Sequence, residues 1–146
     1  YDNGEGELSD AATAMDWLQA QNPASSQCWI AGFSFGSWIG MQLMMRRPEI
    51  RGFISVTPPA TTQDFSFLAP CPASGLVIHG EEDTVVPPDT VHKLVERISI
   101  QKGVKIDVDV VPGANHFFAD HLDGLIARIG GYLDEALTAS DFDPLA

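Results

Sequence analysis

The strongest constraint on the fold is an alternation of short apolar runs with helical patterns. Apolar runs of strand length lie at residues 27–32, 52–56, 75–80 and 104–111. Apolar residues recur at helical spacing over residues 8–20, 36–47, 91–98 and 122–133, and the proline-rich residues 57–74 predict a loop with one helical turn. Strands that alternate with helices predict an α/β protein, in which a parallel sheet with right-handed crossovers carries helices on both faces.

The pattern within each run predicts its place in the sheet. Residues 52–56 and 75–80 are continuously apolar, which is typical of strands buried on both faces. Residues 104–111 alternate between apolar and polar, which favours an edge strand with one face in water. Asp89 is the expected N-cap of the helix that follows residues 87–88. We expect one domain over residues 1–137 and a flexible polar tail over residues 138–146.

Composition excludes several classes of partner. The chain of 146 residues has a net charge of −12 and only 8 Lys and Arg, so neither nucleic acid nor an anionic membrane is an expected partner. No apolar stretch reaches membrane-spanning length and no signal peptide is visible, so we expect a cytoplasmic protein with two reduced cysteines. Because the chain begins with Tyr1 in a loop-like stretch, we expect a processed, truncated or partial sequence.

A G-x-S-x-G motif directly follows the first apolar run. It consists of Gly32, Phe33, Ser34, Phe35 and Gly36, and a helical pattern follows it. In a tight strand-to-helix turn both glycines leave room for the backbone, and the serine Oγ is exposed at the end of the sheet. Ser34 is therefore the candidate nucleophile, although five such residues also occur together by chance.

Polar residues after two later strands complete a Ser-Asp-His order. Asp83 follows the third strand and His116 follows the fourth, so both are expected at the same sheet edge as Ser34. His116 would take the proton of Ser34, Asp83 would orient the imidazole, and the backbone N–H of Phe35 would stabilise an oxyanion.

Each member of this set has competitors in the sequence. Glu81 or Glu82 could be the acid, with Asp83 a turn residue, but Asp83 lies where the chain turns back over the sheet. The competing histidines are interpreted as a packed core residue, a residue on a polar helix face and a residue at the start of the last helix (His79, His92 and His121). No His, Cys or Asp cluster has metal-ligand spacing, and the proposed chemistry needs no cofactor.

Three motifs in this order resemble the C-terminal half of an α/β-hydrolase, most closely the small esterase-like and dienelactone-hydrolase-like members. They are residues 32–36, 79–87 and 113–118, and residues 7–18 resemble the helix before the nucleophile strand. The resemblance covers residues 1–137 and implies a serine hydrolase that cleaves a small carboxylic ester or thioester through an acyl-enzyme. Dienelactone hydrolases use a cysteine nucleophile, so Ser34 points to an esterase-like relative.

The resemblance also implies that earlier strands and a second oxyanion donor are absent from this chain. The sheet would then begin with an apolar, unpaired edge strand, which we expect a second copy or a preceding segment to cover. A non-catalytic module that associates through this edge is the alternative function. Six aromatic residues could line an acyl pocket or pack in the core: Phe33, Phe35, Trp38, Phe65, Phe117 and Phe118.

Overall fold

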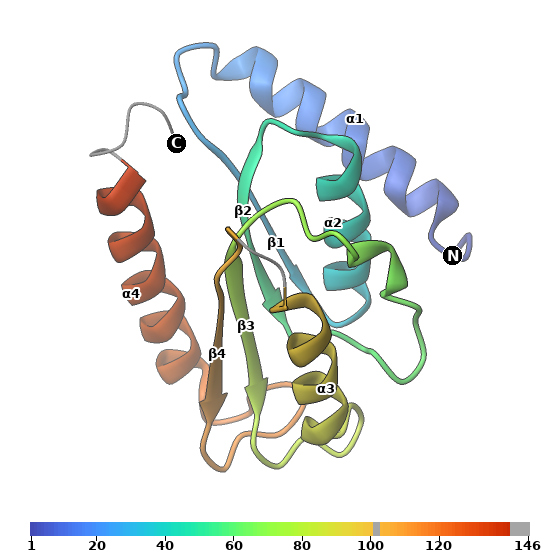
Figure 1. The fold of residues 1–146 in the computed structure, drawn as a ribbon, viewed down its shortest axis with the longest axis vertical. Coiled ribbons are helices and arrows are strands. Elements are labelled where there is room, and N and C mark those ends of the chain that lie inside the picture. Colours follow the sequence, from blue (N-terminus) through green and yellow to red (C-terminus); the bar gives the residue numbers. More distant parts are fainter. Residues whose placement is uncertain (101–102, 141–146) are drawn as a thin grey trace.

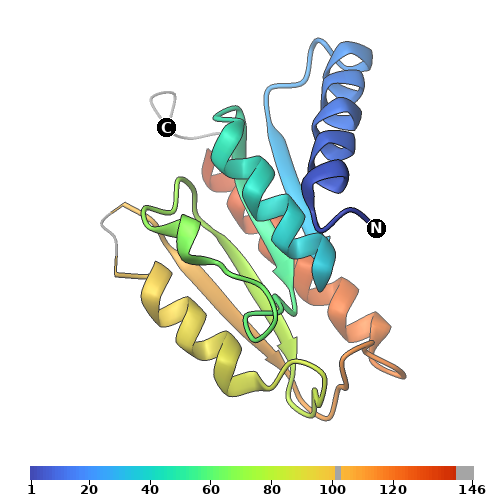
Figure 2. The same cartoon turned by 90° about the vertical axis from the view of Figure 1, so that its right-hand side faces the viewer.

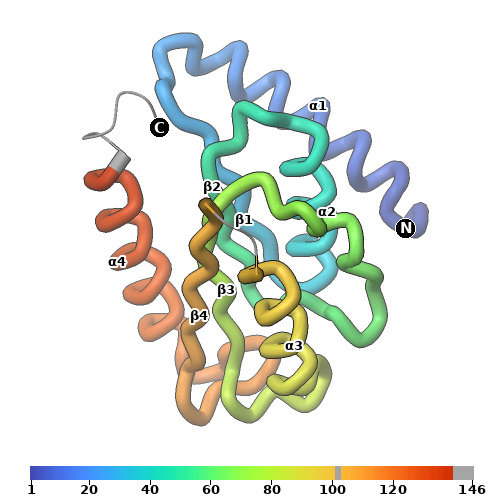
Figure 3. Tube along the Cα trace, viewed as in Figure 1, coloured from blue at the N-terminus to red at the C-terminus, as the bar shows by residue number. Residues whose placement is uncertain are grey.

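The fold is built on four parallel strands that lie side by side in chain order. The computed structural model describes residues 1–100 and 103–140. The strands are β1 (Cys28–Phe33), β2 (Ile50–Val56), β3 (Gly75–Gly80) and β4 (Ile106–Val111), and the sheet order is β1-β2-β3-β4. All three neighbouring pairs are parallel, so the carboxyl ends of the strands meet at one edge (Figures 1 and 3). The predicted parallel sheet is confirmed.

Helices cover both faces of the sheet, as predicted. One apolar core joins α1 (Glu5–Gln21), α2 (Phe35–Arg46) and α3 (Pro88–Ile98) to one face. A second core joins α4 (Leu122–Ser140) to the other face, and Figure 2 shows α4 behind the sheet from the other helices. The loop after β2 contains one 3-10 turn, Ser66–Leu68. Within the described residues no helix is long and apolar enough to cross a membrane.

Burial follows the apolar pattern of the chain. All six residues of β3 are buried, and in β2 only Arg51 is exposed. Met41 and Met44 of α2 are 3% and 2% exposed, so these methionines pack in the core. β1 differs from β2 and β3 because none of its residues is fully buried. It is the edge strand at one side of the described sheet, and β4 is the edge at the other.

Three helix ends differ from the predictions. The first helix begins at Glu5 instead of residue 8, because the Glu7 carboxylate accepts the backbone N–H groups of Asp2 and Gly4 and so caps an earlier turn. Pro87, not Asp89, is the N-cap of α3, and Pro88 follows at the first helical position, which suits proline because it has no N–H to satisfy there. The last helix continues through Ser140, so residues 138–140 are helical, while residues 141–146 lie outside the described residues.

Candidate active site

Ser34 lies in a strained turn between β1 and α2. Its backbone angles, φ 51° and ψ −118°, are rare for a residue with a side chain. The Ser34 N–H donates to the Val56 carbonyl (2.8 Å), and the Ser37 N–H and hydroxyl both donate to the Ser34 carbonyl (2.9 and 2.7 Å). These bonds hold the turn against β2 and within the first turn of α2.

The two glycines of the motif do not have the same role. A Cβ on Gly32 would lie 2.4 Å from the Gly36 carbonyl oxygen, so only glycine fits at this point of the turn. A Cβ on Gly36 would meet nothing within 4 Å in the described chain. The prediction that both glycines are required for space is therefore correct for Gly32 and wrong for Gly36.

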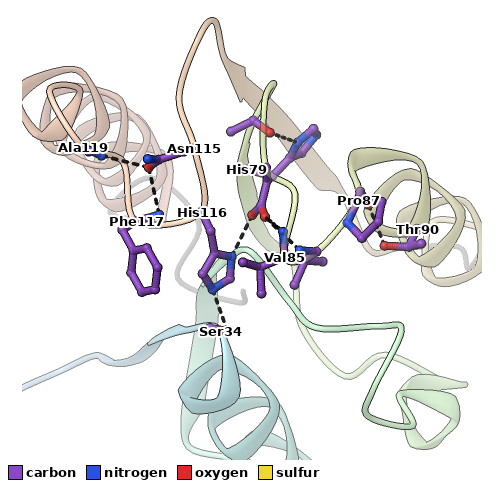
Figure 4. A network of polar contacts seen from close by, with 12 residues as sticks. Ser34, His79, Val85, Pro87, Thr90, Asn115, His116, Phe117 and Ala119 are labelled. Carbon is purple, nitrogen blue, oxygen red and sulfur yellow. Dashed lines mark hydrogen bonds and ion pairs between the residues drawn. The ribbon is translucent and has the colours of Figure 1, made fainter.

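The structure brings Ser34, His116 and Asp83 into one hydrogen-bonded chain. His116 Nε2 lies 3.1 Å from Ser34 Oγ, and His116 Nδ1 lies 2.8 Å from Asp83 Oδ2 (Figure 4). The side chains of His116 and Asp83 are 6% and 0% exposed. An ionised carboxylate only accepts hydrogen bonds, so Nδ1 carries a proton and Nε2 is free to accept from the serine hydroxyl. Ser34 follows β1, His116 follows β4 and Asp83 follows β3.

Asp83 is held by its own turn. Its Oδ1 accepts the backbone N–H groups of Val85 (2.9 Å) and Val86 (2.8 Å), which leaves Oδ2 for His116 (Figure 4). The neighbouring carboxylates take other places, because Glu81 Oε2 accepts the Gly113 N–H (2.9 Å) and Glu82 is exposed. Asp83 is thus the acid that reaches the histidine.

The competing histidines lie away from Ser34. His79 is fully buried, as predicted, and its Nε2 lies 2.8 Å from Nε2 of His92, a contact that the sequence pattern did not reveal. Burial lowers the pKa of His79, with a smaller effect of nearby His92 in the same direction. His121 precedes α4 and bonds through Nδ1 to the Ala119 carbonyl (2.8 Å).

The loops that carry Asp83 and His116 are tied to each other. The Glu81 N–H donates to the Val111 carbonyl (3.0 Å) and the Glu82 N–H donates to the Ala114 carbonyl (2.9 Å). Gly80 permits this approach, since a Cβ there would lie 2.3 Å from the Ala114 carbonyl oxygen. Figure 3 shows the two loops side by side at the carboxyl ends of β3 and β4. Gly80 directly precedes the acidic loop and is the sequence feature that could have indicated this contact.

The surroundings of Ser34 are aromatic and open. Phe35 begins α2, where a backbone N–H has no acceptor in a preceding helical turn. Its ring lies 5.4 Å from Tyr1 and 5.7 Å from Trp38, measured between ring centres. Two hollows of about 470 and 520 Å³ lie elsewhere, at the start of β1 and between α3 and the loop after β2, and no residue of the Ser34–His116–Asp83 chain lines either.

Fold and site together place the chain among the α/β-hydrolases. The sheet carries a strained serine turn after one strand and an acid and a histidine after later strands, in the chain order of that superfamily. The chain belongs to the dienelactone hydrolase family, whose model matches residues 2–139.

Three relatives illustrate the similarity. An uncharacterized protein of Rickettsia prowazekii is 48% identical over 137 residues, which are 91% of this chain and 58% of that protein. A crystal structure of a protein of unknown function from Agrobacterium tumefaciens is 55% identical with a TM-score of 0.92, and the match covers 95% of this chain and 64% of that one. A Xanthomonas campestris protein described as an α/β serine hydrolase without a lid is 30% identical with a TM-score of 0.81, over 92% of this chain and 59% of that one. This chain therefore spans about three fifths of the length of these relatives.

Proposed function

We propose that this chain carries the catalytic residues of a serine hydrolase that cleaves a small carboxylic ester or thioester through an acyl-enzyme. The observation that carries the proposal is the continuous chain from Ser34 Oγ through His116 to Asp83, with distances of 3.1 and 2.8 Å. A serine hydroxyl is a weak nucleophile without an adjacent base, and this arrangement supplies one. The description of the Xanthomonas relative as a serine hydrolase supports the same assignment.

The first half of the reaction forms the acyl-enzyme. Ser34 Oγ attacks the carbonyl carbon of the ester, and its proton passes to His116 Nε2. Asp83 Oδ2 accepts a hydrogen bond from His116 Nδ1–H and stabilises the imidazolium that forms. The negative oxygen of the tetrahedral intermediate lies near the start of α2, where the Phe35 N–H is one donor. Collapse breaks the carbon–oxygen or carbon–sulfur bond, and Nε2–H protonates the leaving alcohol or thiol.

The second half regenerates the serine. A water molecule attacks the acyl carbon and gives a proton to His116 Nε2, which then returns it to Ser34 Oγ as the acid leaves. The Phe35 N–H is the one donor identified among the described residues, and loss of one oxyanion donor typically lowers turnover by about 10² to 10³. The relatives are longer than this chain, and we infer that in them a second donor comes from the part that this chain does not match.

Active-site labelling tests the proposal directly. The chain and the complete product of its reading frame are incubated with a fluorophosphonate probe and, separately, with p-nitrophenyl acetate. We expect covalent labelling and ester cleavage that disappear in Ser34→Ala and persist in Ser9→Ala, a change at an exposed serine of α1. Labelling that survives Ser34→Ala would refute the nucleophile assignment.

The same experiment also tests the alternative function, a non-catalytic binding module. A non-catalytic module that binds through the β1 edge predicts that both proteins are folded by circular dichroism but are neither labelled nor active. It also predicts that the 146-residue chain associates, because β1 is an uncharged edge strand. Light scattering measures that association, and a monomer would contradict it.

A further inference from the structure

Two exposed aromatic rings pack against the imidazole of His116. Phe33, the last residue of β1, lies 5.2 Å from the imidazole, and Phe117 lies 5.0 Å from it at an interplanar angle of 86°. The two phenyl rings are 6.2 Å apart, again between ring centres. Phe117 is 67% exposed and Phe33 is 42% exposed, and Figure 4 shows Phe117 beside His116. The rings of Phe33, Phe117 and His116 therefore form one cluster beside Ser34.

The other aromatic residues near the sheet edge have a different environment. Phe118 and Phe65 are 1% and 3% exposed, so their rings belong to the apolar cores. Burial within the described chain thus accounts for Phe118 and Phe65 but leaves Phe33 and Phe117 in contact with solvent. Exposed apolar surface beside a reactive group is typical of a ligand-binding surface.

The chemistry of His116 indicates which part of a substrate meets these rings. In the proposed reaction, which this inference takes as its basis, Nε2–H donates its proton to the leaving oxygen or sulfur. The leaving group must therefore lie next to the imidazole when the bond breaks. Side chains packed on the imidazole contact the alcohol portion of the ester, whereas the acyl portion remains bonded to Ser34.

Charge restricts the substrate further. Around the site, Glu81, Glu82 and Asp120 are exposed on the loops after β3 and β4. In residues 1–100 and 103–140 the cations lie elsewhere: Arg46, Arg47, Arg51 and Lys105 at the opposite end of the sheet, Lys93 and Arg97 on α3, and Arg128 on α4 in an ion pair with Asp109. Within the described residues the loops after β3 and β4 carry acidic residues but no lysine or arginine, so a substrate carboxylate at Ser34 would have no cationic partner on these loops.

We propose that Phe33 and Phe117 form the binding surface for an apolar alcohol group, so that the site selects neutral esters of alkyl or aryl alcohols. A fully buried methylene group changes binding by roughly fourfold, and an open surface recovers only part of this. We therefore expect kcat/KM to rise about tenfold from ethyl acetate to hexyl acetate. Lengthening the acyl group in ethyl acetate, butyrate and hexanoate should change kcat/KM less.

Variants assign the effect to the two rings. Phe33→Ala and Phe117→Ala should each reduce the preference for hexyl acetate over ethyl acetate, mainly through a higher KM for the hexyl ester. Ile126→Ala is the matched control, because Ile126 is 65% exposed but lies on α4. A preference that persists in both phenylalanine variants, or one that follows the acyl series instead, would overturn the assignment.

A pair of aryl acetates tests the charge argument. Methyl 4-acetoxybenzoate and 4-acetoxybenzoate share their acyl group and ring but differ in charge, and each enzymatic rate is normalised to alkaline hydrolysis. We expect the neutral ester to be cleaved about tenfold more efficiently at low salt, with a smaller difference at high salt. Equal efficiency would refute the selection for neutral esters.

Fluorophosphonate labelling separates failure of this inference from failure of the proposed function. All assays use the complete product of the reading frame beside the 146-residue chain. Labelling of Ser34 together with no alcohol preference would overturn the assignment of Phe33 and Phe117 alone. Absence of labelling in the folded protein would overturn both proposals.

Discussion

The sheet contributes to the site through two different halves. The packed half is β3 and β4 with the loops that follow them, and the strained half is β1 with the turn at Ser34. Every residue of β3 is buried, and the adjoining loops enclose the side chains of Asp83 and His116, which are 0% and 6% exposed. In β1 no residue is fully buried, and Ser34 follows it in a strained turn. The acid and the histidine are therefore preorganised by packing, whereas the serine is positioned by backbone geometry on an edge strand.

The two edges of the sheet differ in charge as well. β4 carries Asp107 and Asp109, and Arg128 of α4 pairs with Asp109. β1 has no charged residue. Charged side chains on an edge strand oppose pairing with another chain, so β4 is protected from such pairing and β1 is not. The strained half, which carries Ser34, is therefore the half that pairing with another strand would affect most.

The largest expected effect comes from the packed half. Asp83→Asn should lower kcat about 10⁴-fold, because an amide at this place no longer holds the productive tautomer of His116. Glu82→Gln, an exposed change one residue away, should leave kcat within about twofold. Ester hydrolysis at saturating substrate measures both, and circular dichroism checks the fold. Similar losses in the two variants would show that Asp83 has no special role.

The next largest effect tests the strained half through its two glycines. Gly32→Ala should destabilise the protein by about 3 kcal/mol, because the new Cβ would lie 2.4 Å from the Gly36 carbonyl oxygen. Gly36→Ala should stabilise it by about 0.5 to 1 kcal/mol, since alanine favours the helix and nothing obstructs its Cβ. Urea denaturation measures both changes. Equal destabilisation would mean that the space around Gly36 is filled.

The fold and the meeting of the three site residues were predictable from the sequence, but the difference between the two glycines was not. The sheet, the helix faces and the meeting of Ser34, Asp83 and His116 follow from strand alternation and from the rule that parallel strands end at one edge. The identical glycines of the motif could not be distinguished, because the difference arises from the distance between Gly32 and the Gly36 carbonyl in the folded turn. Periodicity contains no information on such a distance.

The contacts of individual side chains could not be predicted from the sequence either. The sequence favoured Asp83 over Glu81 and Glu82 from its place after the third strand, but it did not reveal that the Val85 and Val86 N–H groups hold the Asp83 carboxylate toward His116. Aromatic residues were equally ambiguous, since Phe117 and Phe118 are neighbours in the chain but only Phe118 is buried. Such differences depend on side-chain direction after a turn, which residue type does not determine.

A smaller effect should appear at Ser34 itself. Ser34→Gly and Ser34→Ala both remove the hydroxyl, but only glycine adopts φ 51° and ψ −118° without steric cost. We expect the glycine variant to be about 1 kcal/mol more stable than the alanine variant, after allowance for the greater freedom of glycine in the unfolded chain. Thermal and urea denaturation compare the two proteins. A more stable alanine variant would argue that the turn stores no strain.

The smallest effect concerns the buried His79 at the end of β3. Because burial lowers its pKa in the folded protein, the unfolded state binds more protons when the pH falls below about 6.5. The stability due to neutral His79 is thus complete above pH 6.5 and decreases toward the folded-state pKa. At pH 6 the loss is limited to about 0.8 kcal/mol, given an unfolded-state pKa near 6.5.

His79→Gln isolates this contribution, because glutamine does not titrate. The free energy of unfolding is measured by urea denaturation at pH 7.5 and pH 6, and the decrease between them is compared in the two proteins. We expect a larger decrease in the wild type, even where the variant is less stable at both pH values after losing the 2.8 Å contact with His92. Equal decreases would mean that protons reach His79 as easily in the folded state as in the unfolded chain, and the packed half of the sheet would then be more open than its burial indicates.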